Sequence, residues 1–465
     1  MEIKIETLSL TLSFKNAILE VDSLKQFLDS SLKSIKNDEY DFKLKYKNGI
    51  IIADALDSIF KEKGLEKQKQ RLEEINNIKI NDQICIKDIL NIILSEDDIK
   101  DGVLSKISYV ILNQNTYKNN NPKIVRKKEA MFDSQKRLLS QSILSSIVTL
   151  FEAYLSEIYE LLIISNHSEY LSNKQINISQ IFNVSIKDII HNTVQHEVEQ
   201  GMYDSLATLD SLKEKSKVNI DRYCPIRKKF EEIYYRRNIY IHNKGFVNEK
   251  YISKVDSSVC NNIKIGEYAE CSEEYLYRAI RLLKIVISTL YYELLNTQIC
   301  EDKKTYYALS EVGFEALCNE EYDIAEHIYN MLRNQKTFEF IDKATYQVNY
   351  LNALKQQGKN YKKELSEFDV SIATDNFKIA KLCLEDNFEE VYKMLQKSYP
   401  NSFNAEALRE WPLFIDFRKT DFYKEFKENH ISDFNEFVFE DSQQSENSLS
   451  NCEEEIDNIE GAMVP

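Results

Sequence analysis

Glycine and proline are scarce in this chain, with nine and five among 465 residues. These two residues supply many of the tight turns between short strands. Their scarcity argues against sandwiches, barrels and Rossmann-type loops, and it favours long helices. Apolar residues make up 43% and charged residues 29%, which is ordinary globular usage. The length allows two to four domains. We therefore expect a mainly α-helical globular protein.

The charge balance and the cysteines limit the protein class. The net charge is −16, so the chain as a whole is not expected to bind nucleic acid or membrane surfaces nonspecifically. Eight scattered cysteines include no C-x-x-C pair, which predicts reduced thiols and a cytoplasmic protein. The start "MEIKIETLSL" has no signal-peptide pattern. The most apolar helical segments, near 139–164 and 279–296, carry too many charges to span a membrane.

The first segment, residues 1–120, is expected to be an α(+β) domain of unknown type. Alternation in "EIKIETLSLTLSF" is compatible with a strand, and Asn48-Gly49 between apolar runs is a hairpin signal. Helical patterns follow around 51–75 and 86–112. The polar stretch that ends at Pro122 predicts a domain boundary.

A second domain is expected over 123–300. Its main feature is a single apolar stripe with steps of three or four, which predicts one long amphipathic helix. The stripe comprises Leu139, Ile143, Ile147, Phe151, Leu155, Ile158 and Leu162. Further helices are predicted over 177–200 and 202–216. Pro225 suits the first turn of another helix and Gly245 suits the position just past its end. Asn248 and Ser272 are expected to cap two more helices.

From 303 to 432 the pattern changes to pairs of short helices. Tyr322, Tyr361 and Phe388 each follow a short polar turn, at separations of 39 and 27 residues. The mean is near the tetratricopeptide period of roughly 34 residues. Such repeats would bind a protein partner or regulator on their concave face. The acidic, polar tail 433–465 is expected to be disordered.

The stretch "RRNIYIHNKG", 236–245, carries the chemistry. Asn238 and His242 are four apart and share a helix face, so Asn238 could hydrogen-bond to the imidazole and orient it. Arg237 could converge with His242 on a phosphate, whose oxygens its planar guanidinium matches. Histidine can transfer a proton near neutral pH. These residues suit phosphate binding with proton transfer beside it.

Two local excesses of positive charge support RNA as the substrate. Residues 227–250 contain seven basic and three acidic residues, and 123–137 contain six and two. Arg236, Lys228 and Lys244 are expected to contact the RNA backbone. The motif has no carboxylate cluster that would hold magnesium, so no metal or cofactor is expected. Cleavage would then use the 2′-hydroxyl of RNA and two proton transfers. A symmetric dimer would supply the second histidine.

The segment "RRNIYIHNKGFVNEKYI" resembles the HEPN superfamily, with Arg237, Asn238 and His242 in the R-x4-H form. "SILSSIVTLFEAYLSEIYELL" resembles the first long helix of that family, and "IKIGEYAECSEEYLYRAIRLL" resembles the strand-turn-helix that closes many members, so the resemblance covers roughly 130–298. It implies a HEPN helical bundle and a metal-independent endoribonuclease with Arg237, Asn238 and His242 as catalytic residues. It further implies a homodimer with a composite site, acting as a toxin, in abortive infection or in antiviral defence.

One departure from the family limits the partner. Members paired with nucleotidyltransferase antitoxins carry H-x-Y, whereas Asn243 and Lys244 follow His242 here, so that antitoxin is not expected. Two other interpretations stay open. The motif could be a solvated basic helix end, which the helix dipole favours. The domain could also be a catalytically silent HEPN scaffold that binds RNA or protein in a defence complex. His191 and His196 lack the H-E-x-x-H spacing of a metal site, and Glu152 is expected to be satisfied by a neighbour.

Overall fold

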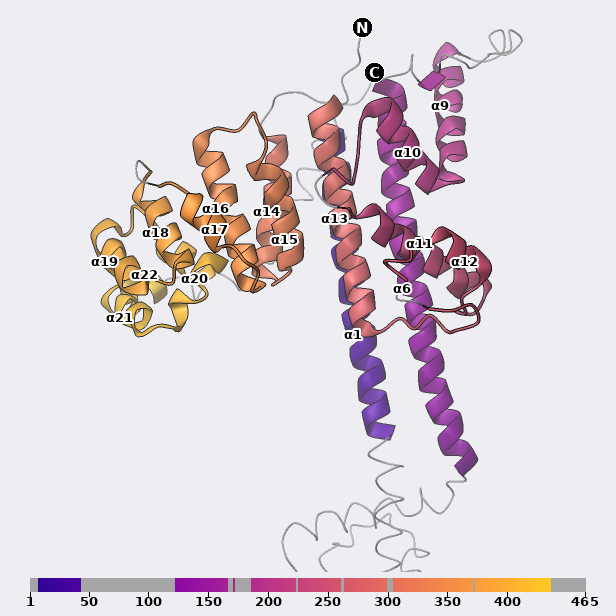
Figure 1. Ribbon diagram of the computed structural model, residues 1–465, viewed down its shortest axis with the longest axis horizontal. Coiled ribbons are helices and arrows are strands. Elements are labelled where there is room, and N and C mark those ends of the chain that lie inside the picture. The colour runs from indigo at the N-terminus through magenta and orange to yellow at the C-terminus, as the bar shows by residue number, and fades with distance from the viewer. Residues whose placement is uncertain are drawn as a thin grey trace, which may run out of the picture. The chain divides into compact units, whose positions relative to one another are not determined.

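The computed structural model describes residues 7–42, 122–165, 170–171, 185–222, 225–260, 263–298, 304–370 and 373–435. Within these ranges the chain is mainly helical, as expected (Figure 1). The β-structure found there is an isolated antiparallel bridge between Phe246 and Tyr268. The hairpin expected at Asn48-Gly49 and the helices expected around 51–75 and 86–112 lie outside the described residues.

The described residues fall into two compact units. Unit 1 comprises residues of Met1–Leu19, Leu150–Glu232 and Arg281–Pro465, and unit 2 comprises residues of Glu20–Thr149 and Ile233–Ile280. Four helices contribute to both units: α1 (Thr7–Phe42), α6 (Pro122–Ser165), α11 (Arg227–His242) and α13 (Glu273–Gln298). The units are therefore interleaved along the chain.

From Thr7 on, helix α1 replaces the strand expected over residues 2–14; residues 2–6 lie outside the described residues. Leu10, Phe14 and Val21 are fully buried and lie four and seven residues apart, which is helical spacing. In unit 1, the Phe14 ring stacks on Tyr291 of α13 with centroids 4.1 Å apart. In unit 2, Lys36 pairs with Glu273 of α13 at 2.6 Å. Burial of one helical face against α13 therefore outweighs the local alternation that suggested a strand.

Helix α6 contains the apolar stripe predicted for 139–162, and the stripe is buried throughout. In unit 1 it is followed by α9 (Ile186–Met202) and α10 (Ser205–Ser216). Ser185 caps α9 by accepting from the Asp188 amide at 3.1 Å. Asp204 caps α10 by accepting from the Ala207 amide at 3.1 Å. Each cap satisfies one of the free amides at a helix start.

The helices from 305 onward follow one another in helix–turn–helix pairs, and Figure 1 shows them as a succession of short helices. They are α14 (Thr305–Cys318), α15 (Tyr322–Arg333), α16 (Phe340–Gln356), α17 (Lys362–Glu367), α18 (Asp375–Leu384), α19 (Phe388–Ser398), α20 (Ala405–Glu410), η3 (Pro412–Phe414), η4 (Phe417–Lys419), α21 (Asp421–Asn429) and α22 (Ile431–Asn435). Residues 433–435, expected in the disordered tail, are the end of α22.

The turns within the first three pairs share one geometry. Glu320, Gly358 and Asp386 have φ of 60°, 66° and 59°. In each turn the next amide bonds to the carbonyl five residues back, at 2.8 to 3.0 Å. This is the Schellman motif that ends helices at a left-handed residue. Tyr322 and Phe388 begin the second helix of their pairs, and Tyr361 immediately precedes α17.

Candidate functional site at the end of α11

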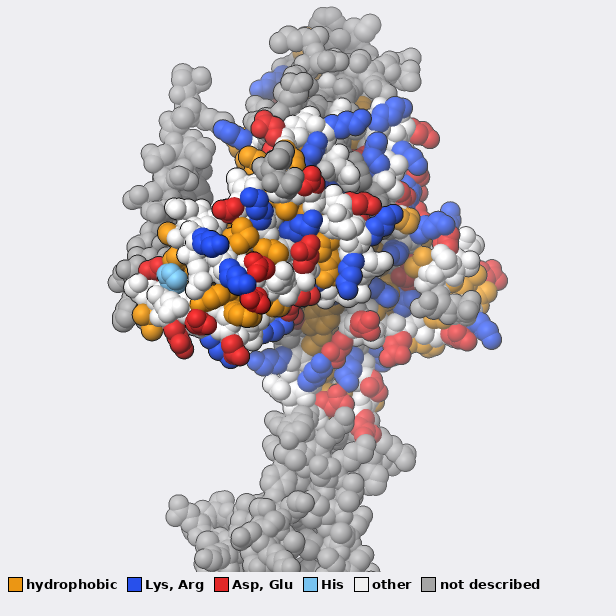
Figure 2. Space-filling view, turned by 60° about the vertical axis from the view of Figure 1, so that its left-hand side comes forward, with side chains coloured by type: hydrophobic (Ala, Val, Ile, Leu, Met, Phe, Trp, Pro, Cys, Tyr) orange, Lys and Arg blue, Asp and Glu red, His pale blue; other side chains and the backbone are white. Residues whose placement is uncertain are grey.

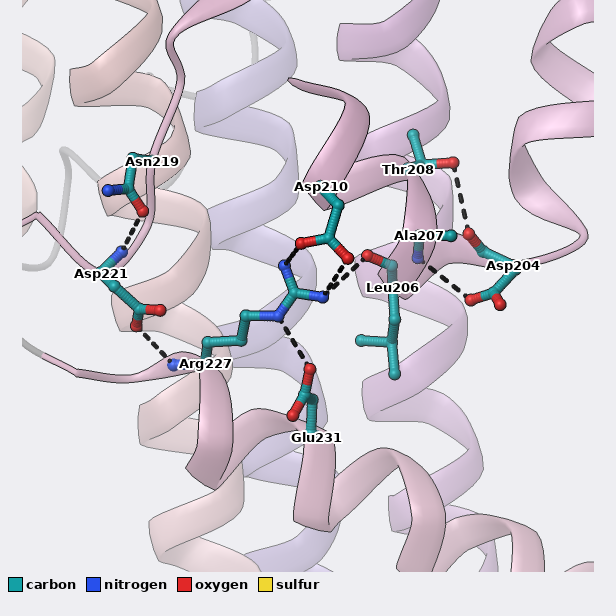
Figure 3. A network of polar contacts seen from close by, with 9 residues as sticks. All are labelled: Asp204, Leu206, Ala207, Thr208, Asp210, Asn219, Asp221, Arg227 and Glu231. Carbon is teal, nitrogen blue, oxygen red and sulfur yellow. Dashed lines mark hydrogen bonds and ion pairs between the residues drawn. The ribbon is translucent and has the colours of Figure 1, made fainter. Parts of the chain in front are cut away.

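Helix α11 is anchored at its start by one arginine (Figure 3). The Arg227 guanidinium forms ion pairs with Asp210 at 2.6 Å and with Glu231 at 2.8 Å, and it donates to the Leu206 carbonyl at 3.0 Å. The Arg227 amide donates to Asp221 at 2.9 Å. These contacts, all in unit 1, fix the first turn of α11 against α10. Pro225, expected in that turn, lies two residues before it.

Arg236 is part of the interior of unit 2. It is 9% exposed, and its Nη1 donates to the Glu270 carbonyl at 2.8 Å. Its Nη2 donates to the Tyr251 hydroxyl at 3.4 Å, and its guanidinium carbon lies 4.4 Å from the centre of the Tyr275 ring. Arg236 thus braces α11 against α12 (Glu249–Lys254) and the start of α13. Arg236 could make its expected contact with RNA only if these contacts were broken.

Arg237, the next residue, is half-buried and contacts neutral groups on its own helix. Its Nη1 donates to the Asn238 Oδ1 at 3.0 Å, and its guanidinium carbon lies 5.5 Å from the centre of the Tyr234 ring. The expected hydrogen bond from Asn238 to His242 is not found among the described residues. Asn238, which shares a helix face with His242, instead accepts a hydrogen bond from Arg237.

His242 is exposed and is the last residue of α11. The helix ends there because the chain turns through two left-handed residues, Lys244 with φ 53° and Gly245 with φ 84°. The amides of Asn243 and Gly245 both donate to the Ile239 carbonyl, at 2.8 and 3.0 Å. This confirms the expectation that Gly245 lies just past the helix.

Gly245 also sits against an aromatic ring. A Cβ atom at this position would lie 2.5 Å from Cε2 of Tyr268, so any larger residue would clash. Its carbonyl accepts from the Ala269 amide at 2.9 Å, and the Val247 amide donates to Glu267 at 2.9 Å. The segment after the motif is therefore paired along residues 266–269.

Three further hydrogen bonds fix this paired segment and the helices beside it. The Tyr240 hydroxyl donates to the Ala269 carbonyl at 2.8 Å, and burial raises the pKa of Tyr240 above its ordinary value. Asn248 caps α12 by accepting from the Tyr251 amide at 2.9 Å, as expected. Ser272 caps α13 by accepting from the Tyr275 amide at 3.1 Å, also as expected. The position of His242 is thus set by packing on the opposite side of α11.

Exposed apolar side chains accompany the motif. Ile241 and Phe246 flank His242 and are 40% and 44% exposed, and Ile252 and Ile265 are 38% and 59% exposed. Exposed apolar residues that gather in one segment are typical of an interaction surface. Lys244 is exposed in the same segment, and Lys228 is exposed on the first turn of α11.

Sequence reasoning missed the residues that hold Arg236. Tyr251, Glu270 and Tyr275 lie 15, 34 and 39 residues from Arg236 along the chain. No local spacing connects such positions, and the tyrosines look like ordinary core residues. The one sequence signal was the pair of caps that fixes where α12 and α13 begin.

The other candidate residues have structural explanations. Glu152 accepts a hydrogen bond from Ser205 at 3.2 Å, so its carboxylate is satisfied by a neighbour, as expected. His191 is exposed, and the His196 ring lies 3.8 Å from Glu197. No group of three or more His, Cys, Asp or Glu in the described ranges is arranged to hold a metal ion. No described helix combines the length and apolarity needed to cross a membrane.

Comparison of the chain with family models, with curated proteins and with solved structures found no match. The HEPN resemblance therefore rests on the motif and on the helices that flank it.

Proposed function

We propose that this protein is a HEPN-type, metal-independent endoribonuclease, acting as a toxin or antiviral-defence effector through a dimeric composite site. The observation that carries the proposal is the exposed imidazole of His242 on the helix face that also carries Asn238, the residue that accepts a hydrogen bond from Arg237. A solvated basic helix end would not need a hydrogen bond that fixes one guanidinium in this way.

The proposed reaction assigns a role to each group. One histidine takes the proton from the 2′-oxygen, which attacks the adjacent phosphorus as the bond from phosphorus to the 5′-oxygen breaks. The histidine of the second protomer donates a proton to the departing 5′-oxygen. Arg237 binds the phosphate oxygens and stabilises the charge that develops on them. The products are a 2′,3′-cyclic phosphate and a 5′-hydroxyl.

Asn238 takes a positioning role in this scheme. Its Oδ1 accepts from Arg237 at 3.0 Å, so it sets the direction of the guanidinium rather than that of the imidazole. A small displacement of a catalytic group can lower a rate by up to about a hundredfold. We expect Asn238→Ala to reduce cleavage roughly tenfold to a hundredfold, which is less than the loss from Arg237→Ala.

A direct test uses cellular RNA in EDTA. We expect the native chain to cleave RNA and leave cyclic phosphate ends, and Arg237→Ala and His242→Ala to lose at least about a hundredfold in rate. His191→Ala is the matched control, because His191 is an exposed histidine outside the motif. Equal cleavage by the native chain and both motif variants would refute the catalytic assignment. RNA that stays intact but is bound by the native chain would favour the silent scaffold.

The composite site also predicts self-association through the exposed segment around His242. Replacing Ile241 and Phe246 with aspartate places charge where an apolar contact is expected, so the variant should be monomeric in sedimentation. Loss of the dimer should also lower the cleavage rate per chain of this variant. A monomeric native chain that still cleaves RNA at full rate would contradict the shared site.

A further inference from the structure

A groove of about 400 Å³ lies between α14 and α16, the first helices of the first two pairs in unit 1. Its walls are aromatic. Tyr307 and Phe314 of α14 are 46% and 38% exposed, and Trp411, the single tryptophan of the chain, is half-buried beside them. Figure 2, in which the repeats come forward, shows apolar side chains gathered among charged ones on their surface.

A carboxylate stands between two of the aromatic walls. Tyr307, Glu311 and Phe314 lie at i, i+4 and i+7, so they share one face of α14. The residues that line the groove otherwise carry neutral side chains, so Glu311 supplies its charge. A carboxylate flanked by exposed aromatic rings offers two favourable contacts to a cation and repels an anion.

The groove is held in shape before any ligand arrives. The Trp411 Nε1 donates to the Asn349 Oδ1 at 3.1 Å, and Asn349 is 4% exposed. The Trp411 ring packs edge-on against Phe403 and Phe414, with centroids 5.5 and 5.9 Å apart. Because these contacts already hold the Trp411 side chain in place, it loses little conformational entropy when a ligand binds.

A cation of the chain already lies at this carboxylate. Lys15 Nζ is 3.0 Å from Glu311 Oε2, and both side chains are more than half exposed, at 53% and 60%. Exposed pairs of this kind stabilise the fold by little. Lys15 can therefore be displaced at small cost by another cation that also contacts the aromatic walls.

We propose that this groove binds a lysine or arginine side chain of a partner peptide. The ligand's charged group meets Glu311, its cationic head lies over the faces of Tyr307, Phe314 or Trp411, and its methylene stem covers the apolar wall. The partner expected at these helices would therefore be a peptide with an accessible lysine or arginine. This binding does not depend on RNA cleavage, and it uses residues remote in sequence from the motif.

Trp411 provides the test, since its fluorescence reports on the groove alone. The full chain is titrated with short blocked peptides that differ only in a central Lys, Arg, Gln or Glu between leucines. We expect a saturable fluorescence change with the Lys and Arg peptides, and binding at least about fivefold weaker with Gln and weaker still with Glu. Glu311→Gln and Phe314→Ala should each weaken Lys binding about fivefold to tenfold.

Two variants make the result specific. Lys15→Ala removes the competing cation and should tighten binding up to about fivefold, a gain that a merely damaged groove would not give. Glu315→Gln is the matched control, because Glu315 is an exposed carboxylate of α14 outside the groove lining, and it should bind like the native chain. Equal affinity for the Lys, Gln and Glu peptides, or no saturable change with any of them, overturns the proposal. RNA cleavage by the same preparations is measured separately, so failure of either proposal is distinguishable from failure of the other.

Discussion

Residues 236–246 have an inward side, which packs in the interior of unit 2, and an outward side, which is accessible to solvent. Similar side chains lie on both sides but make different contacts. On the inward side, Arg236 is 9% exposed and braces α11 against Glu270 and Tyr275. On the outward side, Arg237 lies half-buried on Asn238 and precedes the exposed His242. The same contrast separates His242 from His327, which is 9% exposed and hydrogen-bonded to Thr289 at 2.8 Å. Identical side chains can therefore hold the fold together or remain accessible for chemistry.

The sharpest test of this contrast exchanges the two adjacent arginines for alanine separately. Arg236→Ala should lower the free energy of unfolding by about 3 kcal/mol, because it removes a buried guanidinium that donates to the Glu270 carbonyl and packs on the Tyr275 ring. Arg237→Ala should change it by less than about 1 kcal/mol while abolishing the proposed cleavage. Urea unfolding measures both. Equal destabilisation by the two variants would break the comparison.

The buried His327 makes the stability of the fold sensitive to acid. Burial lowers the pKa of His327 to about 4, against 6.5 in the unfolded chain. Between pH 4 and pH 6.5 the unfolded state therefore binds more protons than the folded state. The contribution of His327 to the free energy of unfolding is complete above pH 6.5 and is lost as the pH falls toward 4. The loss reaches about 3 kcal/mol. Unfolding free energies measured across this range should show the decline, and His327→Gln should flatten it. The same slope in His327→Gln would exclude His327 as its source.

Glycine at the turn after the motif can be compared with a second glycine nearby. Gly245 and Gly266 have nearly equal φ values, 84° and 83°, but only Gly245 has a ring where a Cβ would go. Gly245→Ala should cost about 2 kcal/mol, and Gly266→Ala about 1 kcal/mol from backbone strain alone. Thermal unfolding measures the difference, which isolates the contact with Tyr268. A larger loss in Gly266→Ala would contradict that packing.

A smaller effect is expected from a single hydroxyl on the inward side. Tyr240→Phe removes the hydrogen bond to the Ala269 carbonyl and should cost about 1 kcal/mol. Tyr203 is 93% exposed, so Tyr203→Phe should change stability by less than about 0.5 kcal/mol. Chemical denaturation of both variants compares an inward with an outward hydroxyl. No loss in Tyr240→Phe would remove this residue from the support of the motif.

Some of the site could be predicted from sequence because its signals are local. The caps at Asn248 and Ser272 and the helix end before Gly245 depend on contacts within a few residues. Within the described residues 7–14, the strand expected in residues 2–14 is wrong, because the polar and apolar alternation covers only part of the segment. The helical spacing of the buried Leu10 and Phe14, of which Phe14 stacks on Tyr291 of α13, fits the helix instead.

The choice between the two arginines was not local. Arg236 lies three residues after the buried Ile233, and Arg237 lies three residues before the buried Tyr240. A helical period of 3.6 residues therefore fits either arginine to the buried face. The sequence of α11 alone therefore does not show which of the two arginines is buried.

By itself, the sequence determined the helical class, the pairs of short helices after residue 304, and the placing of Arg237, Asn238 and His242 at the end of one helix. These follow from short-range periodicity and capping, which act over one or two turns. The tertiary structure decided which arginine is buried and that Tyr307, Glu311 and Trp411 border one groove. Those outcomes depend on desolvation and contact between segments distant in sequence, and no local pattern records them.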